Sequence, residues 1–142
     1  MRSLKRLIHL PNRDAWLLFE AALTVVVIRI MLQCLPLRTV QRAAVDISLC
    51  WRSVRHCAPD RIVWAIEKAA RLIAGSNCLI EALAGQALLV RYGYKPCLIV
   101  GVGRDEEFNF EGHAWVTSED QILIGGRDTT RYTTILTLGS LS

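Results

Sequence analysis

The chain has 142 residues and a formal charge of +4, and 52% of its residues are hydrophobic against 21% charged. This length suits a single core and excludes two domains of ordinary size. A mean hydropathy of +0.30 is high for a soluble protein, so we expect apolar surface that a partner or a membrane covers.

The positive charge is concentrated in the N-terminal half. Residues 1–60 carry 9 basic and 4 acidic side chains, a net +5, whereas residues 61–142 carry 8 and 9, a net −1. A basic half suits an acidic partner or an anionic surface. Nucleic acid is not expected as a partner, because aromatic and basic residues do not interleave, and arginines solvating amphipathic helices are the simplest interpretation.

The five cysteines follow no regular spacing. An odd count without a signal peptide indicates a reducing, cytoplasmic setting and no disulfide framework. Cys50, His56 and Cys57 lie close together but match no common zinc spacing, so we interpret these cysteines as buried small hydrophobes. The sequence therefore predicts no metal and no cofactor.

Helical periodicity dominates the first two thirds of the chain. Apolar residues recur at helical intervals, and prolines or Gly-Ser-Asn turns separate the segments. Asp60 is a candidate cap for the third helix. The predicted helices cover residues 14–35, 37–55, 61–74 and 78–92.

The first helix is the one serious membrane candidate. Residues 21–28 are uncharged, but Glu20 and Arg29 interrupt the apolar run, which stays below the roughly 20 residues that a span requires. We interpret it as a buried or partner-covered helix. An interfacial membrane helix is the less favoured alternative.

From residue 97 the pattern changes to that of strands. Branched apolar runs cover residues 97–102, 113–117 and 121–124, with an acidic loop at 103–111 and a tight turn at 118–121. The tail from 129 to 138 can add a strand or an irregular edge. Helices followed by a small antiparallel sheet predict an α+β fold.

Two residues in this layout suit nucleophilic chemistry. Cys78 falls in the first turn of a helix, where the partial positive charge favours a thiolate, and His113 falls in a strand. A Cys-His pair can attack a carbonyl carbon and protonate the leaving amine, with helix N–H groups as oxyanion donors. A packing cysteine and a half-buried structural histidine are the alternative interpretation.

Asn77-Cys78-Leu79-Ile80-Glu81, a helix end at Gly93, and His113-Ala114-Trp115-Val116 resemble the transglutaminase-like cysteine proteases of lasso-peptide biosynthesis. Leu10-Pro11-Asn12-Arg13-Asp14 resembles the helical region that precedes the protease core in that family. The resemblance implies a papain-like core at 61–142, with a central helix carrying the cysteine against a small sheet, and an N-terminal helical region for partner docking at 1–60.

The resemblance also implies a function. Such proteins are cytoplasmic leader peptidases that cut the leader from a ribosomally made precursor, and a separate ATP-dependent cyclase then uses the exposed amine. In the split form a separate recognition protein binds the leader. The chain is short for one that also holds that module, so we expect such a partner.

The third catalytic residue departs from the family. The family's Asp falls here at about Gly125-Gly126, so the nearest carboxylates are Asp128 and Asp120. Asp128 is preferred because it follows the strand end, whereas Asp120 is more simply a turn residue. A pair oriented by another acceptor stays open. The alternatives to a peptidase are an acyltransferase or amidase of the same fold, and a non-catalytic scaffold.

Overall fold

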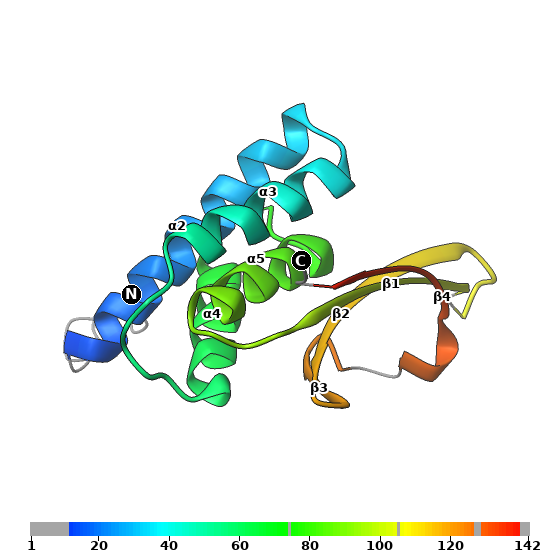
Figure 1. The fold of residues 1–142 in the computed structure, drawn as a ribbon. Coiled ribbons are helices and arrows are strands. Elements are labelled where there is room, and N and C mark those ends of the chain that lie inside the picture. The colour runs from blue at the N-terminus through cyan, green and yellow to red at the C-terminus, as the bar shows by residue number, and fades with distance from the viewer. Residues whose placement is uncertain (1–11, 74, 105, 127–128, 140–142) are drawn as a thin grey trace.

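The computed structural model describes residues 12–73, 75–104, 106–126 and 129–139. These residues form helices followed by an antiparallel sheet (Figure 1), which confirms the predicted α+β class. The helices are α2 (Asn12–Cys34), α3 (Leu37–Cys50), α4 (Pro59–Leu72) and α5 (Cys78–Arg91), and the strands are β1 (Cys97–Arg104), β2 (Phe110–Ser118), β3 (Gln121–Ile124) and β4 (Thr133–Gly139), with a 3-10 turn η1 (Thr129–Arg131) before β4.

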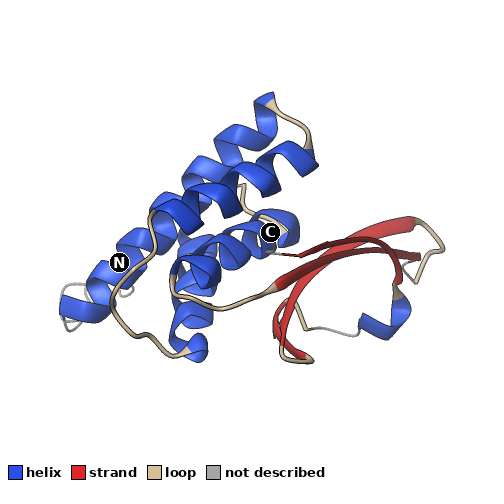
Figure 2. Cartoon of the chain, viewed as in Figure 1, coloured by secondary structure: helices blue, strands red, loops and turns tan. Residues whose placement is uncertain are grey.

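The sheet has the strand order β3-β2-β1-β4, and every neighbouring pair is antiparallel. The helices gather on one side of the molecule and the sheet extends away from them (Figure 2). The C-terminal tail therefore forms an edge strand, and β3 forms the opposite edge. In this register Gly101 of β1 lies opposite His113 of β2.

The end of the second helix and the cap of the third differ from the sequence prediction. The second helix ends at Cys50 and not at 55, because Arg91 Nη1 donates to the carbonyl of Trp51 (2.6 Å) and draws the chain toward α5. The third helix begins at Pro59, with Ala58 as the N-cap, so Asp60 lies in the first turn and is not the cap. Proline is well suited to this first position because its missing N–H would have no helical partner.

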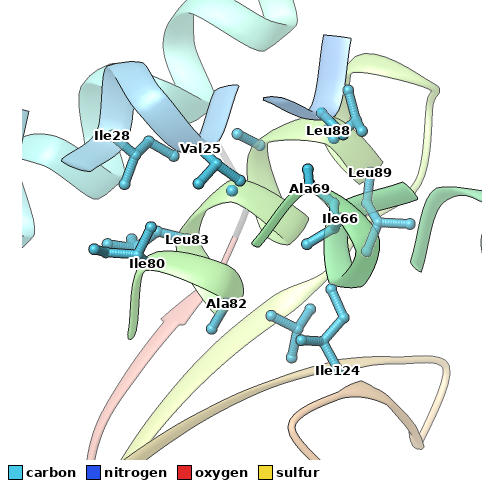
Figure 3. Packing of buried hydrophobic residues seen from close by; sticks show 14 of the residues in the cluster. Val25, Ile28, Ile66, Ala69, Ile80, Ala82, Leu83, Leu88, Leu89 and Ile124 are labelled. Atoms are coloured by element: carbon cyan, nitrogen blue, oxygen red, sulfur yellow. The ribbon is translucent and has the colours of Figure 1, made fainter. Parts of the chain in front are cut away.

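The helix α5 is the centre of the core, and ten of its 14 residues are buried. It packs against α2, α3 and α4 on one side and the sheet on the other. Figure 3 shows Ile124 of β3 reaching the buried side chains of α4 and α5. Gly85 makes this approach possible, because a Cβ there would overlap Cδ1 of Ile124. The hydrophobic cluster contains residues from both sides of position 60. The division into an N-terminal region at 1–60 and a core at 61–142 stays a prediction.

A buried pair of amides links α5 to the sheet edge. Gln86 is only 1% exposed, and its Nε2 donates to the carbonyl of Leu138 in β4 at 2.9 Å. Its Oε1 accepts from Nε2 of Gln41 in α3 at 3.0 Å. A buried amide without partners would be costly, so this pair fixes how α3, α5 and β4 meet.

The two charged residues that interrupt α2 are used inside the fold. Glu20 accepts a hydrogen bond from the Tyr92 hydroxyl (2.8 Å), and burial together with this carboxylate raises the pKa of Tyr92. The Arg29 guanidinium lies against Gly75, in the loop that leads to α5. By length and composition alone α2 could cross a membrane, a property that core helices of soluble proteins share.

We expect Gly85→Val to lower the free energy of unfolding by about 1–3 kcal/mol, because the new side chain overpacks the contact with Ile124. Urea denaturation measures the change. Gly112→Val is the control, since nothing lies within 4 Å of a Cβ at that strand position. Equal effects of the two substitutions would show that the close approach of α5 and β3 is not a packing constraint.

Candidate active site

Cys78 is the first residue of α5, as the sequence predicts. Asn77 is the N-cap, and its Oδ1 accepts a hydrogen bond from the N–H of Ile80 at 3.0 Å. This cap leaves the N–H groups of Cys78 and Leu79 outside its hydrogen bond, at the positive end of the helix. The thiol is therefore held where a negative charge is favoured.

One cavity of about 490 Å³ brings Cys78 and His113 together. The helix start supplies the thiol, and the middle of β2 supplies the imidazole. Both side chains are half-buried, so they are within reach of solvent and of a substrate. The cavity is lined by Glu67, Ala70 and Arg71 of α4, Ser76, Asn77, Cys78 and Glu81 at and before α5, His113 and Ala114 of β2, and Ile124 and Gly125 at the end of β3.

The imidazole of His113 lies in an aromatic cluster. Its ring stacks on Tyr132, with centroids 5.0 Å apart, and on Trp115 at 5.9 Å. Sequence reasoning missed Tyr132. The sequence signal was Gly101, because a glycine inside a strand can mark a place where another group approaches closely. In the structure a Cβ at this position would lie 2.8 Å from Cβ of Tyr132 and 2.9 Å from the Trp115 ring.

The second ring nitrogen of His113 is held by the main chain. His113 Nε2 lies 2.8 Å from the carbonyl oxygen of Gly125. A carbonyl oxygen can only accept, so Nε2 carries the proton in this bond and Nδ1 of the neutral ring is left with its lone pair. Gly125 stands where the resemblance expects the Asp of the triad.

The two candidate carboxylates have different positions. Asp120 is exposed in the β2–β3 turn with a positive φ of 63°, which agrees with its interpretation as a turn residue. Ser118, at the start of this turn, lies five residues along the extended strand from His113, a length of about 16 Å. Asp128 lies outside the described residues, and its role as the orienting acid stays a prediction.

The other cysteines differ from Cys78 in their surroundings. Burial raises the pKa of the Cys57 and Cys97 thiols, and nearby Arg61 partly offsets the rise at Cys57. Cys34 and Cys50 are exposed, so the expectation that Cys50 is buried is wrong. Its position on the outer face of α3 explains the difference.

Within the described ranges, His, Cys, Asp and Glu side chains form no group of three or more that could hold a metal ion.

This arrangement can support acyl transfer by a cysteine nucleophile. A thiol at a helix N-terminus, an imidazole with one nitrogen fixed and one free, and free helix N–H groups are the parts that such chemistry needs. Carboxylates of Glu67 and Glu81 and the guanidinium of Arg71 give the cavity rim mixed charge. Burial, followed by Glu111, raises the pKa of Tyr132, so its phenol stays neutral beside the imidazole.

Comparison with known protein families identifies a superfamily. The family model described as the transglutaminase-like superfamily matches residues 15–137, which include nearly all of α2, the whole of α3, α4 and α5, and most of the sheet. No curated protein and no solved structure matches the chain.

We expect iodoacetamide to alkylate Cys78 faster than any other cysteine near pH 7, because Cys78 lies at a helix N-terminus and shares its cavity with the base His113. His113→Ala should lower the rate at Cys78 by about tenfold or more. Peptide mapping by mass spectrometry measures each site, and the exposed Cys34 and Cys50 provide internal references. Equal rates at all accessible cysteines would favour a scaffold without catalytic activity.

Proposed function

This chain belongs to the transglutaminase-like superfamily, whose members are typically cysteine peptidases and acyltransferases, and we propose that it is the peptidase that removes the leader from a lasso-peptide precursor. The observation that carries the proposal is the shared cavity of Cys78 and His113. The leader specificity is supported by the resemblance of residues 77–81 and 113–116 to the lasso-peptide proteases.

The proposed chemistry uses the groups that line this cavity. Nδ1 of His113 takes the thiol proton, and the Cys78 sulfur attacks the scissile carbonyl carbon to form a C–S bond. The N–H groups at the start of α5 stabilise the oxyanion. When the C–N bond breaks, the imidazolium gives its proton to the leaving amine, which is the new N-terminus of the core peptide. Water, deprotonated by His113, then hydrolyses the thioester and releases the leader.

The exposed face of α2 suits the recognition partner of such a peptidase. Between Ala15 and Ile30 every exposed residue of this helix is apolar, because Glu20 and Arg29 contact other parts of the fold and are only partly exposed. It forms a groove of about 500 Å³ with α3, which we call the α2–α3 groove. Its large apolar lining residues are Trp16, Phe19, Leu23, Val27, Ile28, Met31, Ile47, Trp51 and, from α5, Leu88.

The surface charge of the N-terminal region favours an acidic partner over a neutral one. In the described part of the first 60 residues the exposed arginines outnumber the exposed acidic residues. An amphipathic helix with an apolar face and acidic flanks would satisfy both features. The exposed basic residues are Arg13, Arg38, Arg42, Arg52 and Arg55, and the exposed acidic residues are Asp46 and Asp60.

We expect the chain, with its recognition protein, to cleave the precursor peptide into leader and core. Cys78→Ala should lower the rate by at least about a thousandfold, because it removes the sulfur that forms the acyl-enzyme. Mass spectrometry of the products measures cleavage, and Cys34→Ala, at an exposed cysteine outside the cavity, is the matched control. Undiminished cleavage by Cys78→Ala would reject the mechanism.

The same assay separates a peptidase from an acyltransferase. A peptidase leaves a free carboxylate on the leader even when a primary amine is added in excess. An acyltransferase of the superfamily would instead join that amine to the leader carbonyl. The mass of the leader product therefore decides which nucleophile resolves the thioester.

We expect Leu23→Glu to weaken binding of the recognition protein by at least about tenfold, because it places a charge in the centre of the apolar groove. Isothermal titration calorimetry measures the affinity. Val54→Glu is the control, since Val54 is fully exposed and lies outside the groove. Cys78 alkylation should be unchanged in both variants. Equal affinities would place the partner on another surface.

A further inference from the structure

We infer that the main-chain carbonyl of Gly125 orients His113, in the place where a transglutaminase-like triad has a carboxylate. The inference rests on the proposed Cys78–His113 pair and adds a positioning group to it. Three observations carry it: the bond from His113 Nε2 to Gly125 O, the backbone conformation of Gly125, and the close packing of that residue on β2.

The hydrogen bond selects one tautomer of the imidazole. Since the Gly125 oxygen has no proton to give, the bond of 2.8 Å requires the proton on Nε2. The neutral ring then presents Nδ1 as the base. A histidine with the opposite tautomer would have no lone pair available on the nitrogen that takes the thiol proton, so the carbonyl keeps the ring in the competent form.

Gly125 reaches this position because it has no side chain. Its φ is +75°, in the left-handed region that favours glycine, and a Cβ would lie 2.6 Å from the Ala114 carbonyl oxygen. The chain leaving β3 can therefore lie directly against β2. Gly126 differs, because a Cβ there would meet only Ile122, at an ordinary contact distance of 3.4 Å.

A carbonyl dipole is a weaker partner for an imidazolium than a carboxylate is, so in this chain it supplies orientation more than charge. Other groups set the electrostatics of the ring. The stacked phenol of Tyr132 is neutral, and the charged side chains of the cavity come from two helices. Among the described residues, the titratable and charged groups around His113 are Cys78 and Glu81 of α5, Glu67 and Arg71 of α4, Tyr132 before β4, and Glu111 on β2 with its ion-pair partner Arg131.

The tautomer can be observed without any catalytic assay. In Cys78→Ala at pH 8, where no thiol can share a proton with the ring, long-range ¹H–¹⁵N spectra of His113 should show the proton on Nε2. A dominant Nδ1–H tautomer would overturn the inference. Retention of the Nε2–H tautomer in a protein that cleaves no precursor would support the inference and reject only the peptidase proposal.

Substitutions at Gly125 and Gly126 test the positioning role of Gly125 in the protein that keeps the Cys78 thiol. We expect Gly125→Ala to lower the Cys78 alkylation rate by about tenfold, the size expected for one lost hydrogen bond. The dependence of the remaining rate on pH should then approach that of His113→Ala. Gly126→Ala should stay within about twofold of the wild type. Circular dichroism and the melting temperature confirm that each variant is folded.

Asp128→Asn separates the main-chain carbonyl from a side-chain carboxylate on the same nitrogen. Here the inference departs from the sequence prediction: if Asp128 orients the ring the alkylation rate should fall, whereas the inference expects a rate within about twofold of the wild type. A loss in Asp128→Asn as large as that in His113→Ala would overturn the inference and assign the orienting role to that carboxylate. If Gly125→Ala failed to fold, the tautomer and the Asp128→Asn rate would still decide the question.

Discussion

The structure depends on the close contact between α5 and β3, where Gly85 admits the side chain of Ile124. Together with the direct packing of α5 on β2, this contact sets the distance between the helix that begins at Cys78 and the strand that carries His113. A larger residue at 85 would push the two elements apart, and close-packed interiors absorb such a change poorly. The buried amides of Gln41 and Gln86 add direction to this packing, because they pair only in one arrangement of α3, α5 and β4.

The site shows how a main chain can take over a task that side chains often perform. A carboxylate acts from a variety of backbone positions, because its side chain bridges the gap. A carbonyl has no such reach, so its strand must lie against the strand of the histidine. Gly125 allows this approach by its positive φ and missing Cβ, and Gly101 likewise gives space to the rings of Tyr132 and Trp115. The geometry of the site therefore depends on two glycines, Gly101 in β1 and Gly125 directly after β3.

The high hydropathy of the chain has a structural origin in α2. This helix is apolar on its buried face because it packs on α4 and α5, and apolar on its outer face because its two interior charges, Glu20 and Arg29, are turned toward the protein. An amphipathic helix would instead be apolar on one face and polar on the other. Sequence periodicity therefore cannot distinguish the inward face of α2 from the outward one, which explains why composition indicated covered apolar surface without locating it.

The sequence by itself determined the local structure: the cap at Asn77, the helix that begins at Cys78, the strand type of His113 and the α+β order of elements, since each follows from neighbours within a few residues. It also contained the signature of the superfamily. Only the tertiary structure decided that α3 ends at Cys50, that Asp60 is no cap, that Tyr132 stacks on His113, and that a carbonyl of Gly125 meets the imidazole. These features depend on contacts between segments far apart in the chain. The types and spacing of residues within one segment do not show which distant residue each of them will contact.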